Sequence, residues 1–133
     1  MNQIGIPNLD KKLEASLIAD MVKVEDLMRS HIQGDYPLVV ETSRHLVEAG
    51  GKRLRPLLTL IAAQFGDPTN YDIIKAAVCC ELTHLATLYH DDVMDDAVLR
   101  RGVISTNKKW NNAVAILTGD YLFSKVSDML ADI

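Results

Sequence analysis

The sequence predicts an all-α fold, and three observations support that prediction. Apolar residues recur at the three- and four-residue spacing of amphipathic helices in several long segments. No segment shows the strict alternation of apolar and polar residues that marks a half-buried β-strand. Glycine, proline, asparagine and aspartate gather between the helical segments, where the chain has to turn. With 133 residues, of which 48% are hydrophobic, the chain is long enough for one domain, residues 1–133, with a buried core.

Five helices are expected, and their ends follow from capping residues and helix breakers. Asn8 or Asp10 can cap the first helix, and Ser105 or Thr106 can cap the last, because their side chains accept hydrogen bonds from free amide groups. Proline is tolerated in the first turn of the second and third helices. In chain order, the five helices are predicted over about residues 10–32, 37–48, 56–65, 71–97 and 106–133.

Composition excludes several classes of function. The net charge is −4, so the chain lacks the positive charge that nucleic-acid binding requires, and only 5% of its residues are aromatic. No stretch has the apolar length of a membrane span, and residues 1–10 do not form a signal peptide. The neighbouring Cys79 and Cys80 cannot sensibly bridge each other, so we expect small buried residues of a reduced, cytoplasmic protein.

The end of the long fourth helix carries an acidic cluster that folding does not explain. Asp91 and Asp95 lie one turn apart, as do Asp92 and Asp96, and His84 lies on the same face. Like charges at this spacing repel each other, and they also face the negative end of the helix dipole. A solvated acidic helix end is one interpretation. A bound Mg²⁺ is the other, because paired carboxylates are hard ligands for an ion that keeps water and shares a phosphate.

Two basic segments point to a phosphate-bearing partner. The first, residues 50–56, reads Gly-Gly-Lys-Arg-Leu-Arg-Pro and precedes a predicted helix, whose amino end attracts anions. The second, Arg100-Arg101-Gly102, directly follows the acidic cluster. The first segment is not a P-loop, because the glycine spacing is wrong and no Ser or Thr follows the lysine. Solvated basic residues or plain salt bridges are the alternative, but the combination suits a metal-diphosphate site.

These motifs resemble the trans-type (all-E) isoprenyl diphosphate synthases, the polyprenyl synthetases. Residues 50–56 match the GGKRxRP motif, Asp91–Asp95 matches the first aspartate-rich motif DDxxD, and residues 99–102 match the LRRG that follows it. His84 stands where the family places a substrate-binding histidine. The resemblance implies an antiparallel helix bundle of the isoprenoid-synthase type, of which this chain would supply only the N-terminal helices.

The resemblance also implies a reaction and a role for each motif residue. The enzyme would join isopentenyl diphosphate head-to-tail to an allylic prenyl diphosphate, releasing diphosphate with Mg²⁺ as cofactor. Asp91 and Asp95 would ligate Mg²⁺ with Asp92 in support, which makes these three the catalytic carboxylates, and Arg100 would bind the allylic diphosphate. The diphosphate of isopentenyl diphosphate would be bound by Lys52, Arg55, His84 and Arg101.

Two further expectations concern the whole enzyme. Nothing after Arg101 resembles the family's second aspartate-rich motif, so we expect the 133 residues to be the N-terminal portion of a longer synthase, and activity of this chain alone to be doubtful. Ala86 and Thr83 are small residues before the DDxxD motif, in a region where short-product members tend to carry a bulky aromatic. They imply a product longer than fifteen carbons.

Other interpretations remain open. His90-Asp91 could imitate the HD pair of a metal phosphohydrolase, which would release phosphate or a phosphomonoester and would leave the basic segments unexplained. A non-catalytic partner subunit of a synthase is the second alternative, although such a subunit would not need intact metal and phosphate residues. We expect a homodimer, or a heterodimer, formed through helices.

Overall fold

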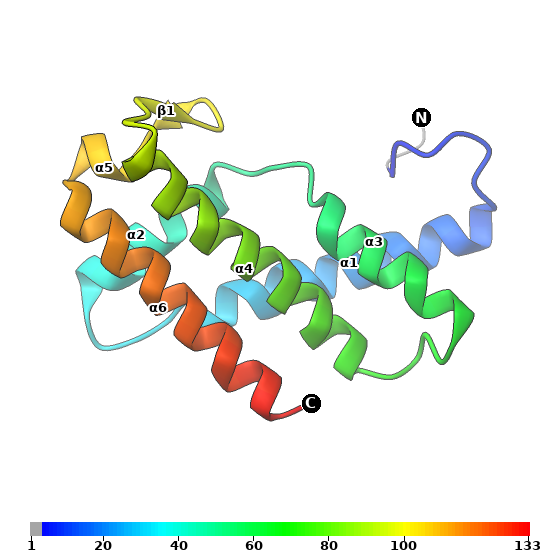
Figure 1. Ribbon diagram of the computed structural model, residues 1–133. Coiled ribbons are helices and arrows are strands. Elements are labelled where there is room, and N and C mark those ends of the chain that lie inside the picture. Colours follow the sequence, from blue (N-terminus) through cyan, green and yellow to red (C-terminus); the bar gives the residue numbers. More distant parts are fainter. Residues whose placement is uncertain (1–3) are drawn as a thin grey trace.

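The computed structural model describes residues 4–133 as an assembly of helices and confirms the all-α prediction (Figure 1). A 3₁₀ turn over Ala63–Phe65 follows the third helix, and a two-stranded hairpin lies between the fourth and fifth. The helices, in chain order, are α1 (Lys11–His31), α2 (Pro37–Glu48), α3 (Leu54–Ala62), α4 (Asp72–Met94), α5 (Thr106–Lys109) and α6 (Asn112–Ala131).

Helix α4 is the element on which the other helices pack. It crosses the molecule diagonally in Figure 1, with α6 along one side, α3 along the other and α1 behind it. Its buried residues are mostly apolar and lie on several sides of the helix, so neighbouring helices pack around it. The core therefore follows α4, from Ile74 near its start to Tyr89 near its end.

The first two helices begin and end almost where the sequence predicts. Asp10 is the N-cap of α1, and its carboxylate accepts a hydrogen bond from the amide of Leu13. Leu17, Val24 and Met28 form the buried stripe of α1, at the expected helical spacing. Helix α2 has the predicted bounds.

The segment after α4 differs from the prediction. Helix α4 ends at Met94, because Asp96 adopts a left-handed conformation with φ of 49°. Strands β1 (Leu99–Arg100) and β2 (Val103–Ile104) then pair antiparallel. Arg101 and Gly102 make the turn with φ of 54° and 76°, as a two-residue hairpin of the I′ type needs. Strands of two residues are too short to give an alternating pattern in the sequence.

The predicted last helix is in fact two helices. Trp110 ends the short α5 in a non-helical conformation, and Asn111 caps α6 by accepting a hydrogen bond from the amide of Val114. In the sequence, Asn111 is a good capping residue for the start of α6, but no glycine or proline marks the break between α5 and α6. Of the helices within residues 4–133, none combines the length and apolarity that crossing a membrane needs.

Candidate functional site

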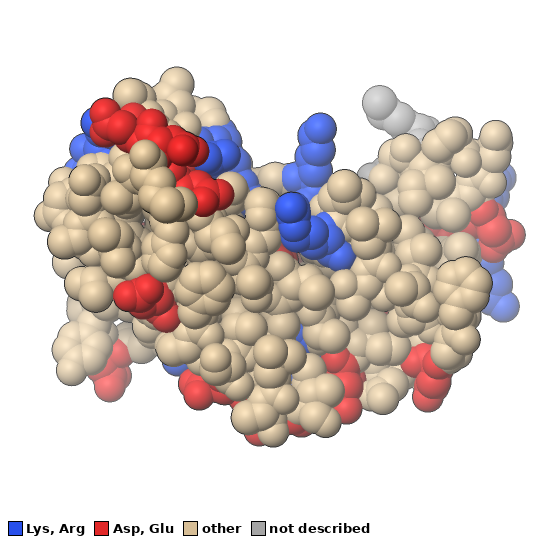
Figure 2. Space-filling view, viewed as in Figure 1, with Lys and Arg blue, Asp and Glu red and all other residues tan. Residues whose placement is uncertain are grey.

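The five residues predicted to bind substrate come together at one cavity. It has a volume of about 400 Å³ and lies between the Gly50–Arg53 loop, the start of α3, the middle of α4 and the hairpin. Basic side chains gather along the hollowed upper face of the molecule, and an acidic patch lies toward one end of it (Figure 2). The residues from the prediction that line the cavity are Lys52, Arg55, His84, Arg100 and Arg101.

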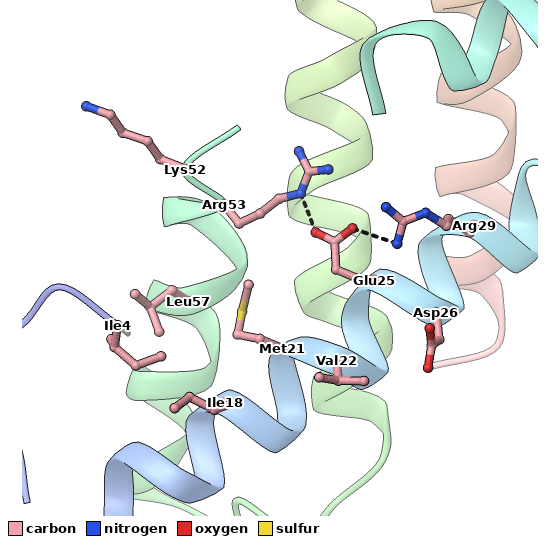
Figure 3. Close-up of a pocket in the computed structure, with 10 residues that line it drawn as sticks. All are labelled: Ile4, Ile18, Met21, Val22, Glu25, Asp26, Arg29, Lys52, Arg53 and Leu57. Carbon is pink, nitrogen blue, oxygen red and sulfur yellow. Dashed lines mark hydrogen bonds and ion pairs between the residues drawn. The ribbon is translucent and has the colours of Figure 1, made fainter. Parts of the chain in front are cut away.

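The loop before α3 directs its two basic neighbours in opposite directions. Arg53 has a left-handed backbone with φ of 49°, and its side chain is buried against Glu25 and Glu81. Lys52, just before it, is exposed and extends away from α1 (Figure 3). Within residues 4–133 Lys52 makes no ion pair, and neither does the exposed Arg55. Two cations are therefore available to an anion in the cavity.

Glycine is required in this loop by its neighbours. Gly51 has φ of 150°, and a β-carbon there would lie 3.0 Å from Cζ of Arg101 and 3.1 Å from Nη1 of Arg53. Both distances are tighter than an ordinary van der Waals contact, so any side chain would push the two guanidinium groups aside. The second glycine of the motif thus lets two arginines pack against the loop backbone.

Arg101 is held by groups of the chain itself. Its guanidinium donates to the carbonyl oxygens of Leu46 and Gly50 and lies 3.5 Å from Oε1 of Glu81. Burial lowers the pKa of Arg101 and the neighbouring Arg53 lowers it further, yet an arginine stays protonated at any physiological pH. It lines the cavity with both hydrogens of Nη1 and one of Nη2 engaged, and the predicted contact between Arg101 and substrate stays a prediction.

Arg100 connects the cavity to the acidic end of α4. Its Nε and Nη2 donate to the same oxygen, Oδ1 of Asp92, at 2.9 and 2.6 Å. Hydrogen bonding to Asp92 raises the pKa of Arg100. Asp92 is buried, and its other oxygen, Oδ2, has no hydrogen-bond partner among the described residues. An unsatisfied buried carboxylate oxygen is a position that a cation or a water molecule would stabilise.

The carboxylates predicted to hold Mg²⁺ lie at the end of α4. The amide of Asp95 donates to the carbonyl of Asp91 at 2.8 Å, so the two residues are one helical turn apart as expected. Asp91 is half-buried and Asp95 exposed. Within residues 4–133, no three His, Cys, Asp or Glu side chains are placed to hold a metal by themselves. Hard oxygens in pairs, with a free oxygen on Asp92, fit an Mg²⁺ ion that completes its shell with water and phosphate.

The fourth aspartate of the cluster is separate from this pair. Asp96 lies beyond the helix, turned away by its left-handed backbone, and its Oδ1 accepts from Nζ of Lys108 at 2.6 Å. The expected stacking of Asp92 and Asp96 does not occur, because the helix ends before a full turn separates them.

His84 is the cavity group whose charge can change near neutral pH. Burial lowers its pKa below the ordinary 6.5, and the positive charge of Arg55 lowers it further. The imidazole is therefore neutral at pH 7, with one N–H to donate and one nitrogen to accept.

The two residues predicted to control product length lie in different surroundings. Thr83 lines an apolar groove of about 550 Å³ between α3, α4 and α6, together with Leu58 and Val126. Ala86 has no exposed surface, and its carbonyl oxygen would be 3.0 Å from a β-carbon at Gly119 of α6. It packs between helices in this structure and lines none of its cavities within residues 4–133.

Helical geometry explains why Thr83 and Ala86 lie in different surroundings. Ala86 is five positions before Asp91, about 140° around the helix, whereas Thr83 is about 80° away. The prediction that both cysteines are buried is confirmed for Cys79 alone. Cys80 is exposed and lines the groove.

The histidine of the supposed HD pair points elsewhere. His90 Nε2 lies 3.0 Å from the carbonyl oxygen of Ile116 and 3.3 Å from Oδ1 of Asp120, both on α6. A metal shared by His90 and Asp91 would require this contact to break. The geometry therefore disfavours the phosphohydrolase interpretation.

A second cavity lies on the other side of the Lys52–Arg53 loop. It has a volume of about 470 Å³ and an apolar wall from Ile4, α1 and α3, and the Arg53–Glu25–Arg29 ion pairs lie along one edge (Figure 3). Among residues 4–133, its lining shares only Lys52 and Arg53 with the first cavity.

Sequence reasoning missed two groups of functional interest. Glu81 is a lone carboxylate in an apolar stretch of α4, a pattern that signals a buried partner for a cation. Asn107 is buried, and its Nδ2 donates to the carbonyls of Asp92 and Ala97 at 3.2 and 3.0 Å. It adds a hydrogen bond to a carbonyl in the last turn of α4 and another to a carbonyl just beyond the helix, and so fixes the aspartate-bearing terminus.

Comparison with known proteins bears directly on this site. The sequence profile described as polyprenyl synthetase matches residues 36–133. The nonaprenyl diphosphate synthase of Mycobacterium tuberculosis is 43% identical over 128 residues, which is 96% of this chain and 38% of that protein. Component 2 of the heptaprenyl diphosphate synthase of Geobacillus stearothermophilus is 42% identical over 92% of the chain and 38% of that protein.

Solved structures show the same likeness. A polyprenyl synthase from Caulobacter crescentus, solved with calcium and isoprenyl diphosphate, superposes with a TM-score of 0.85 at 38% identity, over 90% of this chain and 37% of that one. The chain thus spans somewhat over a third of the length of such proteins.

Proposed function

The chain belongs to the polyprenyl synthetase family, and on that basis we propose that it supplies the N-terminal, substrate-binding part of a prenyltransferase. The reaction is the head-to-tail condensation of isopentenyl diphosphate with an allylic diphosphate, giving a longer all-trans prenyl diphosphate and free diphosphate. The observation that carries the proposal is the single cavity lined by Lys52, Arg55, His84, Arg100 and Arg101.

The cations and the histidine of the cavity account for binding of isopentenyl diphosphate. Lys52 and Arg55 have no competing ion pair among the described residues, so their charge is available to the phosphate oxygens. A neutral His84 adds a hydrogen-bond donor. Arg101 shapes the cavity from its fixed position.

The end of α4 accounts for the leaving group. Arg100 would exchange part of its contact with Asp92 for the allylic diphosphate, and Asp91 and Asp95 would hold Mg²⁺ with Asp92 in support. When bound, Mg²⁺ supplies positive charge that stabilises the departing diphosphate. The allylic carbon–oxygen bond breaks, the double bond of isopentenyl diphosphate forms the new carbon–carbon bond, and a proton is lost. The chain contributes by positioning and electrostatics, and no side-chain nucleophile is needed.

Product length is proposed to depend on the apolar groove that Thr83 lines. The small side chain of Thr83 leaves room in that groove, which favours a product longer than fifteen carbons. In a synthase that contains this chain, Thr83→Phe should shorten the products, because an aromatic ring would fill part of the groove. Product length is measured by chromatography of the dephosphorylated prenols. Ala86→Phe serves as the contrast, since a large residue there would overpack α4 against α6 and destabilise the fold instead. An unchanged product distribution in a stable, active Thr83→Phe enzyme would refute the role of the groove.

Assembly into a homodimer or a heterodimer through helices is part of the proposal. Exposed apolar side chains on α6, including Ile116, Leu117 and Leu130, favour a further contact. The name of the Geobacillus relative, component 2, speaks of a partner in that protein. A cytoplasmic location stays a prediction from the two unbonded cysteines.

The test is binding of isopentenyl diphosphate to the chain by titration calorimetry. Lys52→Ala should weaken binding about tenfold, since a charge-assisted hydrogen bond contributes about 1.5 kcal/mol. Lys12→Ala is the matched control, because it removes the same charge from an exposed position at the start of α1. Equal losses in both variants would mean that only net charge matters, and would contradict the proposed site. Release of inorganic phosphate from the ligand would favour the phosphohydrolase alternative.

A further inference from the structure

A buried ion cluster lies directly beneath the phosphate-binding loop. Glu81 is only 2% exposed, in the middle of α4, and its Oε1 accepts from both Arg53 and Arg101, at 3.3 and 3.5 Å. The carbonyl oxygen of Gly50 also accepts from both arginines. Two cations from separate segments therefore share one carboxylate and one backbone carbonyl.

The cluster extends to the first helix. Glu25 of α1 pairs with Nε of Arg53 and, through its other oxygen, with Arg29 at 3.1 Å (Figure 3). Arg53 also donates to the carbonyl of Val47 at the end of α2. One buried arginine thus joins α1, α2 and α4 to the loop that precedes α3.

The positions of the outward-facing cations follow from this inward anchor. Arg53 lies between Lys52 and Leu54 in the chain, and its left-handed backbone reverses the direction of the loop. When its side chain is fixed against Glu81 and Glu25, Lys52 is directed out of the protein and α3 begins at a set place, with Arg55 in its first turn. Arg101 fixes the hairpin in the same way, and the hairpin carries Arg100.

We infer that Glu81 is a positioning residue: through Arg53 and Arg101 it holds Lys52, Arg55 and Arg100 in the geometry that binds a diphosphate. The inference rests on the proposed function, because it concerns the same cavity. The effect that it assigns to Glu81 is the reverse of what the charge of Glu81 alone would have on an anion. A carboxylate beside an anion site repels the anion, yet this one strengthens binding by ordering the cations around it.

Positioning and simple electrostatics therefore predict opposite changes in anion affinity when the charge of Glu81 is removed. The probe is inorganic diphosphate, titrated calorimetrically into the complete 133-residue chain. Removing a negative charge near the cavity strengthens anion binding if simple electrostatics governs affinity. Glu81→Gln should instead weaken diphosphate binding by tenfold or more, because Arg53 and Arg101 would then share a neutral amide oxygen, which binds two cations less strongly than a carboxylate does. Glu81→Asp, which keeps the charge on a shorter side chain, should recover part of the affinity.

Two controls separate positioning from other effects. Glu48→Gln removes the same charge from an exposed residue that pairs only with Arg29 among the described residues, so its affinity should equal or slightly exceed that of the wild type. Val24→Ala destabilises the core of α1 without touching the cluster, and its affinity should not change while the protein stays folded. Urea unfolding of each variant verifies that the titrations are done on folded protein.

A second variant keeps the inference testable if Glu81→Gln does not fold. Glu25→Gln removes the negative charge from the outer contact of Arg53, and also from the contact with Arg29, at a partly exposed residue, and should weaken diphosphate binding about threefold. Binding by a folded Glu81→Gln variant, or in its absence by Glu25→Gln, that equals or exceeds the wild type overturns the inference. If the wild-type chain itself binds no diphosphate, the proposed function fails instead, so the two failures are distinguishable.

Discussion

Neighbouring residues with the same charge take opposite roles in this chain. Lys52 is exposed while Arg53 is buried, and Arg100 reaches the acidic end of α4 while Arg101 turns to backbone carbonyls. In each pair the second residue, Arg53 (buried) or Arg101 (half-buried), has a left-handed backbone, with φ of 49° and 54° respectively. Such a conformation costs about 1 kcal/mol in a non-glycine residue, and the hydrogen bonds of the two guanidinium groups offset that cost.

At the scale of single residues, His84 should make diphosphate binding depend on pH. Its pKa is below 6.5 in the free chain, and a bound anion favours the protonated ring, so the pKa rises on binding. Diphosphate binding should therefore take up a proton between these two pKa values, and affinity should fall as the pH rises through that window. Calorimetry in buffers with different ionisation enthalpies measures the proton uptake.

The contribution of His84 to the pH dependence must be separated from that of diphosphate, which itself titrates. The His84→Gln variant supplies that correction, because glutamine keeps a polar side chain that does not titrate. Subtracting its pH profile from that of the wild type leaves the contribution of His84. Identical profiles in the two proteins would show that His84 does not face the anion.

At the scale of elements, helix α4 determines where the site residues lie. One side of α4 packs closely on α6, where Ala86 and His90 meet Gly119, and the other side opens to the groove and the cavity. Asn107 of α5 fixes the end of α4 by hydrogen bonds to the carbonyl of Asp92, in its last turn, and to that of Ala97, just beyond the helix. The short helix that the sequence did not separate from α6 thus has a definite function in the fold.

The close approach of α4 and α6 can be measured at Gly119. Gly119→Ala should destabilise the chain by about 1–3 kcal/mol, because the added methyl group meets the His90 ring and lies 3.0 Å from the Ala86 carbonyl oxygen. Urea unfolding followed by circular dichroism gives the free energy. Gly34→Ala is the matched control: its β-carbon has only an ordinary contact of 3.9 Å with the Tyr121 hydroxyl. If the two substitutions cost the same, the contact at Gly119 is looser than described.

At the scale of the whole molecule, the acidic and basic groups form two halves of one proposed site. The cavity contributes cations, and the end of α4 contributes carboxylates, with Arg100 and Asp92 in contact between them. Neither half suffices for a metal: no three metal-binding side chains converge within residues 4–133. Metal and diphosphate should therefore bind together more strongly than either does alone.

This coupling is a testable property of the chain. Mg²⁺ should bind weakly by itself and at least fivefold more tightly when diphosphate is present, since a coupling of about 1 kcal/mol corresponds to that factor. Titration calorimetry of Mg²⁺ with and without saturating diphosphate, corrected for the magnesium–diphosphate complex in solution, measures it. Asp91→Asn should reduce the coupling, whereas Asp128→Asn, an exposed aspartate of α6, should not. Equal Mg²⁺ affinity under both conditions would rule out a shared site.

The sequence by itself determined the all-α class, the bounds of α1 and α2, and the family, because helical periodicity, capping residues and motif spacing are local properties of the chain. Only the tertiary structure decided which motif residues are free to act. Arg53 is a cation in the sequence, but burial between Glu25 and Glu81 removes it from the surface, and Arg101 is partly turned toward Glu81 while it still lines the cavity. Ala86 and Thr83 are small residues three positions apart, yet one lies between helices and the other in a groove. These differences depend on contacts with residues that are distant in the chain, and the pattern of neighbouring residues in the sequence does not show such contacts.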